Sequence, residues 1–269
     1  MLTSNQFQIS GNRCGGIAVA AGLLACVPST YAALLVQPET GIFTTTTTSA
    51  SPVPADKDEG LFSAMYAPFG SFFGSALSGT PTISTNGHLY WGAGNSNDSH
   101  VQFLGTNSMT RIAPMWGDFK LGTGSRIIQA MAENYFAVTW ENIESVDSPG
   151  TVATFQAIFF EFADTVQGNS FSPGDIVFSY GNLGAYQAMN EVIVGLESGT
   201  SFATLPGTMA GWNSYGVTGN IPVGAGEFAR FRPDGAGNYT VSVLPIPEPT
   251  SAALGFAGGL LMLRRRRAC

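Results

Sequence analysis

Four acidic residues lie beside aromatic residues in segments that predict strands, and they are the side chains best suited to catalysis. They are Asp118, Glu141, Glu144 and Glu161. Hydrolysis of a glycosidic bond needs two carboxyl groups facing each other across a cleft, roughly 5 to 9 Å apart. The sequence brings no two of them together, and it contains neither a Gly-x-Ser-x-Gly motif nor a glycine-rich phosphate loop that opens a helix. We therefore predict no catalytic residues and no enzyme, and keep a secreted glycoside hydrolase as an alternative.

Groups that could bind a metal ion are sparse in this chain. His88 and His100 are 12 residues apart without a further ligand pattern, whereas zinc needs three or four ligands of defined geometry. Calcium needs clustered oxygens. Two clusters could supply some of these oxygens without the spacing of an EF-hand: Asn95, Asn97 and Asp98, and also Asp56, Asp58 and Glu59. We predict no metal site and no cofactor, with solvated loops as the default and calcium left open.

Aromatic residues near turns are the candidates for ligand binding. Tyr90 and Trp91 end a short apolar run, while Trp212 and Tyr215 lie in an irregular segment rich in glycine, proline and threonine. Side chains on loops can be exposed on a rigid scaffold, where flat rings could stack on the sugars of an exopolysaccharide. The alternative is that these rings pack back onto a sheet.

Both ends of the chain carry targeting features. At the start, Arg13 precedes an apolar run over residues 14–27, and Thr30, Tyr31 and Ala32 end in a small residue. This order predicts a signal helix in a signal peptide over residues 1–32, cut after Ala32 by signal peptidase. The alternative is a lipoprotein signal in which Cys26 becomes the first, lipid-modified residue.

The final segment, residues 245–269, has three parts in order. Pro247, Glu248 and Pro249 precede 14 uncharged residues, and four arginines follow: Arg264, Arg265, Arg266 and Arg267. As a helix, the uncharged run spans roughly 21 Å, less than the roughly 30 Å hydrocarbon core, and predicts a short transmembrane helix. The arginines should stay cytoplasmic and retain the precursor in the inner membrane.

This arrangement resembles the PEP-CTERM sorting signal of Gram-negative bacteria. The resemblance implies recognition near Pro247, Glu248 and Pro249 by an exosortase, a membrane-embedded transpeptidase. A plain membrane anchor with a positive flank is the alternative, and either interpretation predicts an exported body.

The body between the two targeting segments is acidic and lacks cysteine. Residues 33–249 contain 6 basic and 18 acidic residues, which leaves a net charge of −12, while the three cysteines are Cys14, Cys26 and Cys269. A strongly negative surface repels phosphates, so we predict no nucleic-acid partner. Without disulfides or a cysteine metal site, the stability of the body must come from packing.

Short apolar runs bounded by turn residues predict an all-β fold, either a sandwich or a barrel, and we expect an antiparallel β-sandwich. Phe136, Val138 and Trp140 alternate onto one face of their strand, whereas residues 152–162 are apolar on both faces and predict a strand covered on both sides. Asn86 and Gly87 predict a tight hairpin turn. The domain order is a strand or linker over 33–59, a β domain over 60–199, and an irregular excursion with closing strands over 200–244. We expect runs at 61–66, 82–84, 88–91, 101–104, 111–119, 126–131, 135–143, 152–162, 175–180, 191–196, 227–231 and 239–244.

The β domain over 60–199 resembles a nidogen-like (NIDO) domain. The resemblance rests on an ordered set of segments: APFGSFFG at 67–74, TISTNGHLYWG at 82–92, RIAPMWGDF at 111–119, FAVTWENI at 136–143, ATFQAIFF at 153–160, IVFSYGNL at 176–183 and EVIVGLESG at 191–199. It implies an extracellular, non-catalytic protein of the cell surface or matrix with a structural or adhesive role. As partners we expect other surface proteins or, through the aromatic candidates, exopolysaccharide. A carbohydrate-binding module is the alternative.

Overall fold

Strands alone make up the regular structure of the described part of the chain. The computed structural model describes residues 34–39, 41–48, 58–68, 70–92, 104, 109–183, 192–205, 221, 223 and 226–247, all within one compact unit, Tyr31–Cys269. Every strand pairing is antiparallel, which confirms the all-β prediction. Within these residues no helix is long and apolar enough to cross a membrane.

The larger sheet has eight strands. Its order is β1 (Phe43–Thr48), β9 (Arg126–Met131), β10 (Tyr135–Ser145), β11 (Val152–Phe160), β14 (Ile176–Tyr180), β17 (Glu227–Pro233) and β18 (Tyr239–Pro245), and β8 (Phe119–Lys120) pairs with β10. The threonine run that could have been a strand or a spacer forms β1, which pairs with β9 from Phe43 to Thr48. The fold therefore includes residues before position 60.

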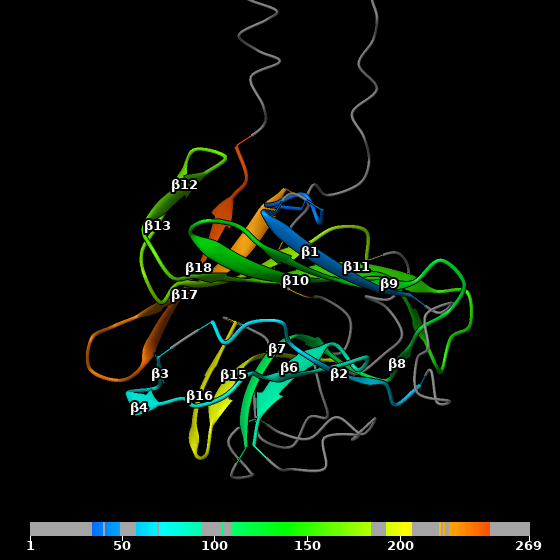
Figure 1. Cartoon of the computed structure of the whole chain (residues 1–269), viewed down its shortest axis with the longest axis horizontal. Helices are drawn as coiled ribbons and strands as arrows, with labels where there is room; N and C mark the ends of the chain where they lie inside the picture. Colours follow the sequence, from blue (N-terminus) through cyan, green and yellow to red (C-terminus); the bar gives the residue numbers. More distant parts are fainter. Residues whose placement is uncertain are drawn as a thin grey trace, which may run out of the picture. The chain divides into compact units, whose positions relative to one another are not determined.

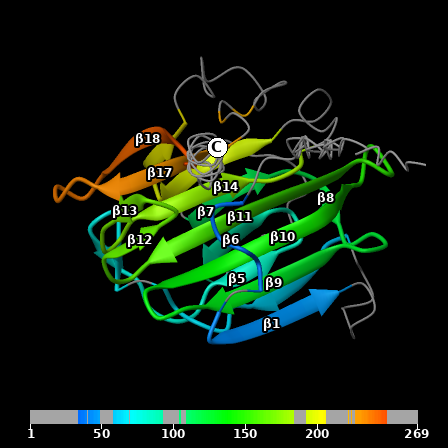
Figure 2. The same ribbon diagram turned by 90° about the horizontal axis from the view of Figure 1, so that it is seen from above.

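The smaller sheet has six strands, and two hairpins complete the fold. The order is β16 (Ser201–Thr204), β15 (Ile193–Ser198), β7 (Thr110–Trp116), β6 (His88–Trp91), β5 (Thr82–Ser84) and β2 (Leu61–Ser63). The hairpins are β3 (Ser71–Phe72) with β4 (Ser75–Ala76), and β12 (Asp164–Val166) with β13 (Asn169–Phe171). The two large sheets face each other as the layers of a sandwich, seen edge-on in Figure 1 and from above in Figure 2.

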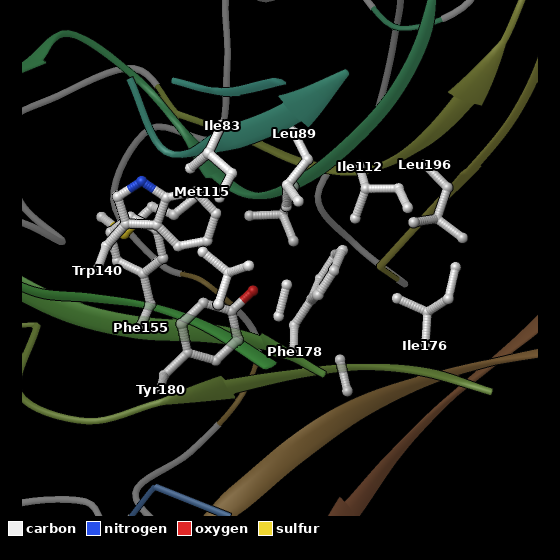
Figure 3. Close-up of a cluster of buried hydrophobic side chains, with 14 of the residues drawn as sticks. Ile83, Leu89, Ile112, Met115, Trp140, Phe155, Ile176, Phe178, Tyr180 and Leu196 are labelled. Carbon is white, nitrogen blue, oxygen red and sulfur yellow. The ribbon is translucent and has the colours of Figure 1, made fainter. Parts of the chain in front are cut away.

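The core between the sheets is almost entirely apolar. Ile83, Leu89, Ile112 and Leu196 of the smaller sheet face Trp140, Phe155, Ile176 and Phe178 of the larger one (Figure 3). Two aromatic polar groups inside this layer are paired across it, because Trp140 Nε1 donates to the Ser84 carbonyl at 2.9 Å and the Tyr180 hydroxyl donates to the Pro114 carbonyl at 2.8 Å. These bonds satisfy buried donors and join the two sheets.

The predicted alternation is confirmed on both central strands. Phe136, Val138 and Trp140 face the inner core. On β11, alternate residues divide between the inner core and a second cluster on the outer face, where Ile158 and Phe160 pack against Leu35, Val36, Phe171 and Ile246. Phe162 was expected on this face and is 59% exposed, because β11 ends at Phe160 and the chain turns away.

The β5–β6 hairpin forms where Asn86 and Gly87 predicted it, with a different turn geometry. Three residues, 85–87, connect Ser84 to its partner His88, and among the last two only Gly87 has a positive φ, 74°. A Cβ atom at Gly87 would overlap with the Met115 carbonyl. The side chain of Asn86 instead accepts a hydrogen bond from the Phe119 N–H at 2.9 Å. Glycine is required here by both conformation and space.

Candidate functional site

A cavity among the described residues opens where the ends of several hairpins meet. It has a volume of about 510 Å³, within the range of small-ligand sites. The walls come from the β3–β4 hairpin, the end of β11, the β13–β14 turn and the β17–β18 hairpin. The lining residues are Pro68, Gly70, Ser71, Phe73, Gly74, Phe160, Glu161, Pro173, Gly174, Pro233, Gly235, Gly237, Asn238 and Tyr239. We call this cavity the end pocket.

Two aromatic rings from distant hairpins meet in the end pocket. Phe73 and Tyr239 lie edge to face, with ring centroids 5.0 Å apart, and buried Phe72 contacts Tyr239 at 5.6 Å. Phe73 has a φ of 48°, a conformation that bulky residues rarely adopt. The hairpins approach closely behind the rings, since a Cβ atom at Gly74 would lie 3.3 Å from the Cα atom of Gly237. The aromatic pair thus holds the strained turn in place.

A buried carboxylate anchors the β17–β18 wall. Asp175 is fully buried and binds Arg232 through two bonds, 2.8 Å from Oδ1 to Nε and 2.5 Å from Oδ2 to Nη2. The Ser172 N–H also donates to Asp175 Oδ2 at 2.9 Å. A bidentate contact between arginine and carboxylate fixes the orientation of the two groups as well as the distance between them. This wall of the end pocket is therefore positioned before any ligand arrives.

Glu161 is the one charged side chain in the described part of the pocket lining. Its N–H donates to the Asn134 carbonyl at 3.0 Å, which places it just beyond the end of β11. The Tyr66 hydroxyl donates to its carboxylate and lies 2.7 and 2.6 Å from the two oxygens. This hydrogen bond raises the pKa of Tyr66 above its usual value, with smaller contributions from burial and from the charge of Glu161. A carboxylate has about four acceptor sites, so Glu161 retains acceptors that can face the pocket.

Tyr239 contributes a neutral hydroxyl to the same wall. Burial raises the pKa of Tyr239 well above its ordinary value, and the nearby charge of Asp175 adds to this effect. The phenol therefore stays protonated in the physiological range and can both donate and accept a hydrogen bond. Together with the Asn238 side chain and the Ser71 hydroxyl, it gives the pocket several uncharged polar groups beside its aromatic faces.

The other three predicted carboxylates lie far from Glu161. Glu141 pairs with Arg126, Glu144 accepts from the Gly150 N–H at 3.0 Å, and the carbonyl of Asp118 accepts from the Val146 N–H at 3.1 Å. Glu144 is ten residues along β10 from Asn134, the backbone partner of Glu161, which corresponds to about 33 Å of strand. None of the three can share a cleft with Glu161 at the separation that glycoside hydrolysis needs.

Tyr90 and Trp91, two of the candidates for stacking on sugars, are buried. Their exposed fractions are 5% and 8%. Trp91 stacks on Phe72 at 6.4 Å, and its Nε1 donates to the Gly79 carbonyl at 3.1 Å. The alternative, that these rings pack onto a sheet, holds because β6 is an interior strand between β5 and β7 and both of its faces are covered. Trp212 and Tyr215 lie outside the described residues.

The outer face of the smaller sheet carries a buried ionic cluster. Arg111 on β7 and Glu197 on β15 are opposite each other in the register, and Arg111 Nη1 lies 3.2 Å from Glu197 Oε1 with both side chains fully buried. The guanidinium also lies 3.7 Å from the ring centre of Trp116. Burial lowers the pKa of the neighbouring His88 well below 6.5, and the charge of Arg111 lowers it further. His88 is therefore a neutral structural residue.

The remaining predicted residues fall at the edges of the described regions or outside them. Pro247 is exposed just after β18, next to buried Ile246. Glu59 accepts a hydrogen bond from Asn86 Nδ2 at 3.3 Å, and no group of three potential metal ligands occurs in the described part of the chain. Outside it lie Ala32, Asn95, Asn97, Asp98, His100, Asp56, Glu248, Pro249, Arg264, Arg265, Arg266 and Arg267.

Sequence reasoning did not identify the end pocket. Glu161 was considered only as a catalytic carboxylate, and Phe73 only as part of the APFGSFFG segment at 67–74. Phe73 and Tyr239 are 166 residues apart, and no sequence pattern joins their hairpins. The closest local signals are the glycines that make both turns tight.

A comparison with family models agrees with this fold. A model described as NIDO related matches residues 35–233. The match extends beyond 60–199 on both sides and includes Leu35, β1 and the β17 strand that closes the larger sheet. Comparisons with curated proteins and with solved structures gave no match.

Proposed function

Because the chain belongs to the NIDO-related family, we propose that it is an exported, non-catalytic protein of the cell surface or extracellular matrix with a structural or adhesive role. Membership of this family is consistent with an extracellular or surface location. The observation that carries the proposal is the family match over residues 35–233, which fills the interval between the two targeting segments. Signal peptidase would release the amino terminus after Ala32.

The carboxyl-terminal segment is proposed to sort the protein. In this account the apolar run holds the precursor transiently in the inner membrane, and an exosortase-type enzyme cuts near Pro247, Glu248 and Pro249. The position of the motif supports the proposal, because β18 ends at Pro245 and Pro247 is exposed directly after it. A processing enzyme would then reach the motif without unfolding a strand.

Mass spectrometry of the protein recovered from the cell exterior tests this sorting. We expect a chain that starts at Ala33 and lacks the segment after the motif. Replacing Pro247, Glu248 and Pro249 with alanine should trap the full-length form in the inner membrane, whereas replacing the four terminal arginines should release uncut precursor. An extracellular chain that ends at Cys269 would contradict the proposal in favour of a simple anchor.

Carbohydrate binding is the second candidate function, and the end pocket is the observation that favours it. The residues first considered for stacking do not support it, since Tyr90 and Trp91 are buried. The pocket instead offers two rings, one carboxylate and several uncharged polar groups. A single carboxylate supports binding rather than hydrolysis, which requires a pair. Loss of saccharide hydrolysis in a Glu161→Gln variant would contradict the non-catalytic assignment.

A further inference from the structure

We propose that the end pocket binds a saccharide that is uncharged or carries an amine, and that it rejects acidic saccharides. The inference rests on the proposed function in one respect, because a body exposed at the cell exterior would meet polysaccharide. It names a site, a ligand class and a charge preference, and each follows from the described lining of the pocket.

The aromatic pair supplies an apolar surface for one face of a sugar ring. Phe73 and Tyr239 are partly buried, and their edge-to-face contact at 5.0 Å fixes the orientation of both rings. Tyr239 is also fixed by buried Phe72, with ring centroids 5.6 Å apart. Rigid aromatic rings provide contact area without the loss of many side-chain rotamers on binding. The C–H groups of a sugar ring match such a surface, whereas a flat polar heterocycle would gain less from an edge-to-face pair.

Glycines leave space in the pocket for a polar ligand. A Cβ atom added at Gly70 or at Gly235 would meet no atom within 4 Å, so space remains beside these Cα atoms. The side chains of Ser71 and Asn238, which line the pocket, can reach sugar hydroxyls there. Sugars carry many hydroxyls that both donate and accept, and a lining with both kinds of group satisfies them.

The described lining of the pocket carries only negative charge. Glu161 is the only charged residue among the described lining residues, which contain no lysine, arginine or histidine. The body carries a net charge of −12 in addition. Phosphate, sulfate and uronate groups would therefore enter without a cation to pair with. An ammonium group would donate a charge-assisted hydrogen bond to Glu161, whose carboxylate Tyr66 already holds in position.

Calorimetric titration of the full chain in detergent micelles tests the proposal. The probes are three oligosaccharides of similar length: neutral cello-oligosaccharide, amine-bearing chitosan oligosaccharide and acidic oligogalacturonate. We expect the first two to bind and the third to fail. Glu161→Gln should weaken binding of the chitosan probe about tenfold and change the neutral probe less than about threefold, since a charge-assisted hydrogen bond is stronger than a neutral one.

Two further variants separate pocket contacts from effects on folding. Phe73→Ala should weaken both ligands about tenfold or more, because the ring contact is lost. Phe162→Ala is the matched control: it removes an aromatic ring that is 59% exposed near Glu161 but outside the pocket lining, and it should leave both affinities unchanged.

Several results would overturn the proposal. They are the absence of binding to all three probes, a preference for oligogalacturonate, or equal losses in Phe73→Ala and Phe162→Ala. If the Phe73 variant fails to fold, the Glu161→Gln comparison still decides the outcome. Failure here leaves the sorting proposal intact, because mass spectrometry of the extracellular protein reports export independently of ligand binding.

Discussion

The two ends of strands β10 and β11 differ in how completely the chain satisfies its own polar groups. At one end, Glu144 accepts from the Gly150 N–H, lies 4.0 Å from Lys120 Nζ, and leaves no room for a side chain at Gly122. At the other end, Glu161 has Tyr66 as its partner and borders a cavity of about 510 Å³. A carboxylate at a strand end is thus not enough for a binding site, which also needs unfilled space beside polar and aromatic groups.

The largest expected effect comes from removing a side chain of the core that supports both ends of β10 and β11. Trp140→Ala should lower the free energy of unfolding by about 3 to 5 kcal/mol, because the indole is fully buried and its Nε1 bonds the opposite sheet. Urea unfolding followed by circular dichroism measures this loss. Phe43→Ala, which removes a ring 60% exposed on β1, is the control and should change stability by less than about 0.5 kcal/mol. An unchanged midpoint for Trp140→Ala would contradict the burial of this indole between the two sheets.

The next change acts at the pocket end alone. Asp175→Asn should cost about 2 to 3 kcal/mol, because it removes the negative charge that Arg232 binds with two hydrogen bonds, while the buried site remains polar. Hydrogen exchange should then rise mainly in β17 and β18, the strands of the pocket wall. If exchange rose equally at residues 144–151, Asp175 would support the whole sandwich rather than its pocket end.

Lowering the pH should destabilise the folded chain through His88 on β6, which lies at neither end of β10 and β11. Because the pKa of folded His88 is lowered well below 6.5, the unfolded chain binds a proton below pH 6.5 that the folded chain does not. The free energy of unfolding should therefore fall as the pH falls below 6.5, by about 1.4 kcal/mol per pH unit from this group. Above pH 6.5, His88 should make no contribution to the pH dependence of the free energy of unfolding.

Urea unfolding at pH 7.0 and pH 5.5 tests the role of His88. In a His88→Gln variant the loss between the two pH values should be smaller than in the unchanged chain. Equal losses in both proteins would contradict the assignment of a neutral, buried imidazole next to Arg111.

The smallest effect is expected at the end of β10 and β11 that carries Glu144, which we call the closed end. Glu144→Gln keeps an acceptor for the Gly150 N–H and removes the charge that faces Lys120 at 4.0 Å, where both side chains are partly exposed. Partly exposed ion pairs contribute about 0 to 1 kcal/mol. Urea unfolding should therefore give nearly the same midpoint, and saccharide titration the same affinity. A loss of binding in this variant would mean that the closed end, and not the end pocket, contacts the ligand.

Local sequence patterns predicted most strands of the two large sheets and the faces of β10 and β11, but neither the two small hairpins nor the site. Alternation on β10 and the two apolar faces of β11 were readable because side-chain direction has a period of two residues. The Thr run of β1 remained ambiguous because its pairing with β9 is a long-range contact. Burial of Tyr90 and Trp91 depends on the strands that flank β6. The pocket depends on the approach of the hairpins that carry Phe73 and Tyr239, which packing alone decides.

Hydrogen exchange with and without cello-oligosaccharide tests most directly whether the end of the sandwich with the end pocket is its ligand-binding end. Mass spectrometry of the full chain would follow exchange in both regions at once. We predict slower exchange in the presence of the sugar at residues 70–77, 160–175 and 233–239, with no change at 117–125 and 144–151. Protection at the second set of residues, or no protection at either, would contradict this account.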